Sequence, residues 1–218
     1  MDGQTFKEII DALDRRFPEA KCELNYSTPF ELLVAVILSA QCTDKRVNAA
    51  TKEMFAKYNT PEAIAGMDDA LLERYLYPLG FYRSKTKSLK AAAKKIIDDY
   101  GGRVPDGLAE LTAIPGVGRK TASVILSEAF GKNAFAVDTH VLRVCRRLGI
   151  TDGQNTDPYA AELAVSAIID ADRMGRAHIL MVFFGRYVCT ARNPECEKCP
   201  ITDKCQFVKT KNHAYKEQ

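Results

Sequence analysis

Apolar residues recur at helical spacing along most of this chain, and the pattern predicts a protein built from short helices. The first predicted helix ends at Pro18 and carries an apolar face formed by Phe6, Ile9, Ile10, Leu13 and Phe17. Hardly any stretch alternates between apolar and polar residues with a period of two, which is the pattern of a half-buried strand. We therefore expect an all-α fold of about ten to twelve helices.

One predicted helix is apolar on every side, so it should lie at the centre of the fold. Thr28 is suited to be its N-cap, Pro29 its first residue, and Glu31 the residue that closes a capping box. The seven residues that follow, 32–38, offer no polar face to solvent. Gln41 lies just beyond the end of this helix and is expected at the mouth of the site into which the helix points.

Glycine and proline residues mark the limits of the other predicted helices. A long amphipathic helix should end at Gly101 and Gly102, and a later helix should end at Gly149. Two more helices are expected from 157 to about 169 and from 176 to 187.

The stretch 111–122 reads as a short helix, a Pro-Gly-Val-Gly hairpin and a second helix that runs to about Phe130. The hairpin glycines allow backbone conformations that a β-carbon would penalise, and they leave N–H groups bare at a helix start, where an anion is favoured. We interpret the loop as a phosphate site formed by Gly116, Val117, Gly118 and Arg119. The alternative is a plain connection between two helices.

Lys120 follows in the first helical turn, where a positive charge is disfavoured. The helix dipole and burial would both lower the pKa of its amine and favour the neutral, nucleophilic form. The alternative is a solvated surface lysine.

The charge is unevenly distributed, although the net charge is only +3. Residues 1–80 contain 9 basic and 13 acidic side chains, whereas the remaining residues contain 22 basic and 15 acidic ones. Two basic clusters stand out, Arg83 to Lys95 and Arg143 to Arg147. A polyanionic partner would explain them, as would solvated helix faces.

No apolar run approaches the roughly 18 residues that a membrane span needs, and the first ten residues do not resemble an export signal. We therefore expect a cytoplasmic protein without a membrane partner. In such a reducing compartment, clustered cysteines indicate a metal site more often than disulfides.

Four of the seven cysteines lie close together near the C-terminal end, as Cys189, Cys196, Cys199 and Cys205. Two prolines within this stretch prevent a single helix from running through it, so the thiols should surround a point. Four thiolates suit zinc or an iron–sulfur cluster. Structural zinc sites usually pair two short knuckles, and the single C-x2-C pair here favours a [4Fe–4S] cluster. Three further cysteines are interpreted as inert fillers: Cys22, Cys42 and Cys145.

Taken together, several motifs resemble the endonuclease III family of helix-hairpin-helix DNA glycosylases and AP lyases. They are the hairpin with Lys120, the run Val137-Asp138-Thr139-His140, the run Leu38-Ser39-Ala40-Gln41 and the cysteine spacing. The resemblance extends from about residue 5 to 206. It implies two helical lobes with a DNA cleft between them. One is a six-helix barrel with the hairpin (22–132), and the other is a helical domain with the [4Fe–4S] cluster (1–21 and 133–218).

The resemblance also implies roles for single residues. Lys120 would attack C1′ of an oxidised pyrimidine nucleotide in duplex DNA, form a Schiff base and cleave the strand 3′ to the abasic site by β-elimination. Asp138 would act as an acid/base or electrostatic group, although its local sequence suits a helix N-cap equally well. Gln41 and Phe81 would fill the gap left by a flipped base, whereas the alternative for Phe81 is a core aromatic. The family also implies a monomer in the bacterial cytosol or nucleoid, and His178 is given no role.

Two other functions are alternatives to this interpretation. An adenine-specific mismatch glycosylase would need a carboxylate from the buried helix, and no Asp or Glu occurs between Glu31 and Asp44. A non-catalytic DNA-binding module would keep the hairpin and the basic clusters, but it would not need Lys120 and Asp138 together.

Overall fold

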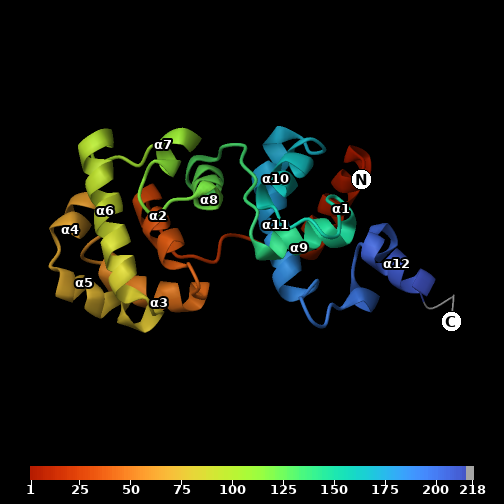
Figure 1. Cartoon of the computed structure of the whole chain (residues 1–218), viewed down its shortest axis with the longest axis horizontal. Helices are drawn as coiled ribbons and strands as arrows, with labels where there is room; N and C mark the ends of the chain where they lie inside the picture. Colours follow the sequence, from red (N-terminus) through yellow and green to blue (C-terminus); the bar gives the residue numbers. More distant parts are fainter. Residues whose placement is uncertain (215–218) are drawn as a thin grey trace. The chain divides into compact units, whose positions relative to one another are not determined.

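The structure, a computed structural model, describes residues 1–214 and is all-helical over these residues, which confirms the expected fold class. The described chain contains twelve α-helices and four short 3-10 helices (Figure 1). Its internal contacts divide it into two units, Cys22–Gly131 and Met1–Lys21 with Lys132–Gln218. The last four residues, 215–218, which the predicted C-terminal domain includes, lie outside the described part.

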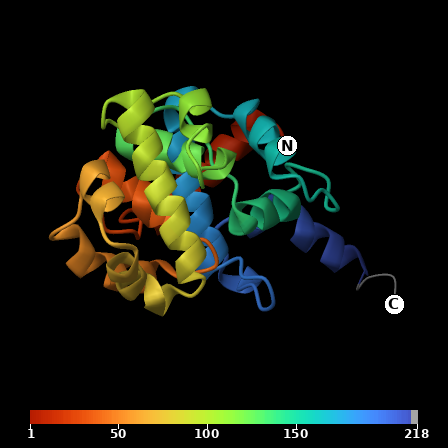
Figure 2. The same ribbon diagram turned by 60° about the vertical axis from the view of Figure 1, so that its left-hand side comes forward.

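The unit of residues 22–131 is organised around α2 (Pro29–Leu38). Every residue of α2 from Phe30 to Leu38 is buried, as the all-round apolar pattern predicts, and α2 packs against α3, α6 and α8. The long α6 runs beside α4 and α5 (Figures 1 and 2). The other elements of this unit are α3 (Asp44–Phe55), α4 (Pro61–Gly66), α5 (Asp69–Leu76), η1 (Tyr77–Leu79), α6 (Tyr82–Tyr100), α7 (Leu108–Thr112) and α8 (Arg119–Phe130).

The start of α2 differs in one bond from the predicted capping box. The Thr28 hydroxyl accepts a hydrogen bond from the Glu31 N–H at 3.1 Å, as expected of an N-cap. The Glu31 carboxylate, however, accepts from the N–H of Ser27 at 2.5 Å, one residue before the cap. The approach of the chain to the helix brings the Ser27 N–H within reach of this buried carboxylate, so that donor is satisfied instead.

The second unit has its core between α1 (Gly3–Arg16), α9 (Thr139–Leu148) and α11 (Met174–Tyr187). It also contains α10 (Pro158–Ser166), η2 (Ala171–Arg173), η3 (Cys196–Lys198), η4 (Thr202–Lys204) and α12 (Gln206–Ala214). Helix α10 is shorter than predicted, because the chain turns after Ser166 and enters η2. Helix α12 was not predicted, since its few apolar residues give little periodic signal.

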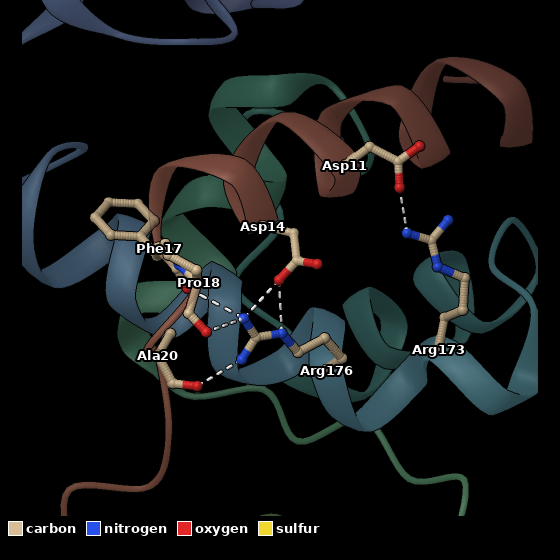
Figure 3. A network of polar contacts seen from close by, with 7 residues as sticks. All are labelled: Asp11, Asp14, Phe17, Pro18, Ala20, Arg173 and Arg176. Carbon is tan, nitrogen blue, oxygen red and sulfur yellow. Dashed lines mark hydrogen bonds and ion pairs between the residues drawn. The ribbon is translucent and has the colours of Figure 1, made fainter.

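Two arginines join the N-terminal helix to the C-terminal half of the chain (Figure 3). Arg173 pairs with Asp11, and Arg176 pairs with Asp14. The Arg176 guanidinium also donates to the carbonyl oxygens that follow α1, those of Phe17, Pro18 and Ala20. Carbonyls beyond a helix end lack helical donors, so this one side chain satisfies them and fixes α1 against α11.

Candidate functional site

The predicted hairpin is a loop between α7 and α8. Gly116 is the position in this loop where the backbone conformation requires glycine. Gly116 has φ +83°, in the left-handed region that L side chains rarely adopt. A β-carbon there would lie 3.5 Å from Ser88 and 3.7 Å from Ile37. Val117 is buried and its N–H donates to the Ile114 carbonyl at 3.0 Å, which closes the turn.

Gly118 contradicts the expectation that both glycines meet a conformational need. It is the N-cap of α8 with φ −87° and ψ 176°, an extended conformation open to any residue. A β-carbon at Gly118 would meet no atom within 4 Å. The fold therefore does not require glycine at this position, and the missing side chain leaves the N-terminus of α8 open.

Arg119 and Lys120 form the start of α8, and both side chains are exposed. The exposure of Lys120 differs from the burial that the sequence argument expected. The helix turns this position outward, while the α8 residues Ala122 to Leu126, which are apolar except for Ser123, are buried within the unit.

Gln41 and Phe81 share a backbone property that the sequence does not reveal. They are the non-glycine residues with positive φ in the described chain, at 56° and 47°. Such conformations cost on the order of 1–3 kcal/mol each and persist where the surrounding structure enforces them. Phe81 is 71% exposed, which excludes the core-aromatic alternative, and Gln41 is exposed as well.

Asp138 is the N-cap of α9, the local alternative considered from the sequence. Its Oδ1 accepts hydrogen bonds from the N–H groups of His140 and Val141, each at 2.8 Å. Both bonds use the same carboxylate oxygen, so capping does not occupy Oδ2. Asp138 and Lys120 belong to different units of the chain.

His178 supports the segment that leads to Asp138, a role that sequence reasoning missed. Its ring lies 2.8 Å from the Ala136 carbonyl oxygen through Nδ1 and meets the Phe135 ring edge-on at 6.0 Å. His178 is 5% exposed. A single histidine on an apolar helix gives no periodic signal, so only the folded structure reveals this contact.

The four C-terminal cysteines line one pocket together with apolar side chains. The apolar lining includes Leu148, Phe184, Val188 and Phe207. Arg147 of α9 supports the loop: its Nη1 donates to the Cys189 Sγ at 3.2 Å and to the Thr190 carbonyl at 2.7 Å. Four cysteines that line an apolar pocket beside a cationic donor suit a thiolate-bound iron–sulfur cluster.

The cysteines differ in their expected reactivity. Burial raises the pKa of the Cys189 thiol, and the Arg147 hydrogen bond opposes that shift. Burial raises the pKa of Cys22 to about 11 and that of Cys145 to about 12, which makes both poor nucleophiles at neutral pH.

Within residues 1–214, no group of three or more His, Cys, Asp or Glu side chains is placed to hold a single metal ion.

Many side chains of the two basic clusters are used inside the fold. Arg143 donates to the carbonyls of Cys189 and Gly185, and Arg147 donates to the cysteine loop. In the other cluster, four lysines have partners within their own unit: Lys85 with Ala40, Lys90 with Met67 and Asp69, Lys94 with Asp98, and Lys95 with Asp99. Neither cluster is therefore a uniform patch of uncommitted cations.

Two models of known protein families match this chain and together cover most of the described elements. Residues 34–168 match the model of the HhH-GPD superfamily of base excision DNA repair proteins. Residues 189–205, which run from the first to the last of the four clustered cysteines, match the iron–sulfur binding domain of endonuclease III. This second match confirms the iron–sulfur prediction over zinc, and the loop carries the [4Fe–4S] cluster of that family.

Individual relatives agree with the family models. The chain is 45% identical over 197 residues to endonuclease III of Bacillus subtilis, and this alignment covers 90% of each chain. It is 40% identical over 200 residues to endonuclease III of Escherichia coli, and that alignment covers 92% of this chain and 94% of the relative. Among solved structures, a trapped endonuclease III–DNA covalent intermediate matches with a TM-score of 0.91 and 42% identity, covering 97% of this chain and 99% of that one. The chain therefore belongs to the endonuclease III family, the base excision DNA glycosylases and AP lyases predicted from its motifs.

Proposed function

We propose that this protein excises oxidised pyrimidines from duplex DNA and then cleaves the strand 3′ to the abasic site through a Schiff base on Lys120. The observation that carries the proposal is the position of Lys120. It stands exposed in the first turn of α8, directly after the hairpin, in a chain that matches a trapped endonuclease III–DNA covalent intermediate. The relatives named above favour this activity over that of an adenine-specific mismatch glycosylase.

In the proposed reaction the neutral Lys120 amine attacks C1′, and the bond from C1′ to the damaged base breaks. The base leaves with a proton. The bond between C1′ and the ring oxygen of the sugar then breaks, which gives the Schiff base. Removal of a C2′ proton then breaks the C3′–O bond, and water releases the enzyme from the product. Because Lys120 is exposed in the free protein, bound DNA would have to supply the desolvation that favours its neutral form.

Asp138 is proposed to serve the same nucleotide as Lys120. Its Oδ1 is engaged by the backbone of α9, which fixes the carboxylate in orientation. Oδ2 then remains to accept a proton from the attacking amine, directly or through water, and to stabilise the positive charge that develops on the sugar. In this proposal, capping and catalysis are two uses of one side chain.

DNA recognition is proposed to combine a backbone contact with a wedge. The open N-terminus of α8, formed by Gly116, Val117, Gly118 and Arg119, would hold a phosphate beside the lesion. A base inside a duplex must be flipped out before Lys120 can reach its sugar. The exposed Gln41 and Phe81 side chains would fill the space it leaves.

The cysteine loop is proposed to have a structural role in this reaction. Cys189, Cys196, Cys199 and Cys205 would hold the cluster, and Arg147 would fix the loop to α9. No chemical step needs the cluster, since the attacking amine and the carboxylate supply the covalent chemistry.

We further propose that the protein acts as a monomer in the bacterial cytosol. The relatives named above are bacterial, and within residues 1–214 no helix is long and apolar enough to cross a membrane. Light scattering coupled to size exclusion should give the mass of one chain, and twice that mass would contradict the proposal.

Borohydride trapping tests the central assignment. The wild-type protein, incubated with a duplex that contains an abasic site and reduced with borohydride, should form a stable protein–DNA adduct. Lys120→Gln should form none, whereas Lys87→Gln, which changes an exposed lysine of α6 in the same unit, should form as much as the wild type. An adduct with Lys120→Gln would disprove the nucleophile, and thymine-glycol duplex left intact by the wild type would disprove the lesion class.

A further inference from the structure

The two exposed wedge candidates, Gln41 and Phe81, sit on two separate turns of the same unit. Gln41 follows α2 in a turn that the Cys42 N–H closes onto the Ser39 carbonyl at 3.0 Å. Phe81 precedes α6 and is its N-cap, in the left-handed conformation. Neither residue is glycine, so other parts of the structure must hold both turns in place.

Lys85, one turn into α6, connects the second turn to the first. Its ammonium donates to the Ala40 carbonyl at 2.9 Å, next to Gln41, and its own N–H donates to the Phe81 carbonyl at 3.0 Å. Lys85 is only 6% exposed. Lysine is rarely buried this fully, and an apolar side chain of similar length could fill the same space without burying a charge. The amine is therefore better explained by the bond it makes than by packing.

Arg46 makes the connection in the opposite direction. It lies in the first turn of α3, shortly after Gln41 along the chain, and its guanidinium donates to the Pro78 carbonyl in η1, shortly before Phe81. Each turn is thus held by a cationic side chain that comes from the element next to the other turn.

We infer that Lys85 and Arg46 form a reciprocal brace that positions Gln41 and Phe81, so that the two side chains enter a duplex as one rigid unit. This inference rests on the proposed function, in which those two side chains fill the gap left by a flipped base. Lys85 and Arg46 are positioning residues: they touch the backbone of the turns, and their effect on the reaction passes through the wedge. A support of this kind is what a precisely placed recognition group requires.

The same helix offers a matched control. Lys90 of α6 is partly buried and also donates to a backbone carbonyl, that of Met67 at 2.6 Å, but it reaches neither turn. The substitutions Lys85→Met, Arg46→Met and Lys90→Met each remove a cation and keep an unbranched apolar side chain. Arg46 is exposed, so Arg46→Met tests the brace without disturbing the core.

The first measurement is hydrogen–deuterium exchange of the cluster-loaded protein without DNA. Lys85→Met should exchange faster at residues 39–43, and Arg46→Met at 78–82. The increase should be about fivefold, which corresponds to the loss of one ordinary hydrogen bond. Lys90→Met should leave both segments unchanged. Unchanged exchange in the first two variants would overturn the brace.

The second measurement compares two reactions of the same proteins. Base release from a thymine-glycol duplex requires flipping, whereas strand scission at a pre-formed abasic site has no base to unstack. Both brace variants should lose about tenfold or more in base release, because small misplacements have large kinetic effects, and should retain scission at the abasic site within about twofold. Equal losses in both reactions, together with a lower melting temperature, would indicate a merely structural role and overturn the inference.

Gln41→Ala and Phe81→Ala separate failure of the inference from failure of the proposed function. If these two lose base release and the brace variants do not, the brace is wrong and the wedge stands. If Gln41→Ala and Phe81→Ala keep full base release, the wedge itself is wrong, and the positioning role is overturned with it.

Discussion

At the residue scale, Asp138 combines a structural and a proposed chemical task that substitutions can separate. Asn and Ser are good N-caps without a negative charge, whereas Ala can neither cap nor ionise. We expect Asp138→Asn and Asp138→Ser to melt close to the wild type but to lose about 10²–10⁴-fold in base release. Asp138→Ala should lose the same activity and also about 1 kcal/mol of stability.

Calorimetry and a single-turnover assay together check this expectation for Asp138. Full activity in Asp138→Ser would show that only the cap matters. An unchanged melting temperature in Asp138→Ala would show that the two hydrogen bonds from α9 contribute little to stability.

Glu128 near the end of α8 gives a pH-dependent prediction. Burial raises the pKa of its carboxyl above the ordinary value of 4.5. The folded protein then binds this proton more tightly than the unfolded chain does, so the contribution of Glu128 to stability falls as the pH rises above 4.5. Glu128→Gln should therefore melt at a higher temperature than the wild type at pH 7, with a difference that shrinks toward pH 4.5.

Thermal melts across this pH range measure the effect of Glu128. Glu53→Gln, which changes an exposed carboxyl of α3, is the matched control and should show no such trend. A stabilisation by Glu128→Gln that is constant with pH would point to packing or hydrogen bonding instead of charge burial.

At the scale of elements, the two hairpin glycines differ in their roles. The fold requires Gly116, whereas the proposed phosphate ligand requires Gly118. Gly116 requires the absence of a β-carbon because of its positive φ, whereas Gly118 has an ordinary backbone and open space around it. Gly118→Ser should keep the melting temperature, since serine is a favourable N-cap, but it should weaken binding to abasic-site duplex by crowding the phosphate. Gly116→Ser should instead lower the stability by about 1 kcal/mol or more.

Fluorescence anisotropy and thermal melts of the two serine variants test this separation. If Gly118→Ser binds DNA as the wild type does, the N-terminus of α8 does not hold a phosphate.

Most helices were predictable from the sequence because their signals are local. Thr28 and Pro29 start α2, Gly101 ends α6 and Gly149 ends α9, as the pattern indicates. Apart from α12, whose periodic signal is weak, the features that escaped prediction depend on contacts between distant segments. The hydrogen bond from His178 to Ala136 links residues 42 positions apart.

The candidate site shows the same limit more sharply. Residue types, spacing and the family resemblance sufficed to propose Lys120, the cysteines and the hairpin as site residues. They did not reveal that Lys85 is buried and donates to the Ala40 carbonyl, because a lysine within a basic cluster is expected to be solvated. Nor did they reveal the left-handed backbone of Gln41 and Phe81, since nothing in either residue type favours it.

At the scale of the whole molecule, part of the basic excess is used in internal bonds and part is proposed to contact DNA, and salt dependence can distinguish the two. Each phosphate contact that is lost reduces the slope of log affinity against log salt concentration by about 0.9. Lys94 pairs with Asp98 at 2.8 Å on the surface of α6, and that carboxylate raises the pKa of its amine, so it should contribute little to the slope. Arg119, at the start of α8, should contribute one contact.

We therefore expect DNA affinity to fall steeply with salt for the wild type and equally steeply for Lys94→Gln. Arg119→Gln should bind more weakly at low salt and show a slope smaller in magnitude by about 0.9. Titrations by anisotropy at four or more salt concentrations give these slopes. A reduced slope for Lys94→Gln would mean that its ion pair opens to meet a phosphate. An unchanged slope for Arg119→Gln would remove the hairpin cation from the DNA interface, since a group that displaces no counterion makes no phosphate contact.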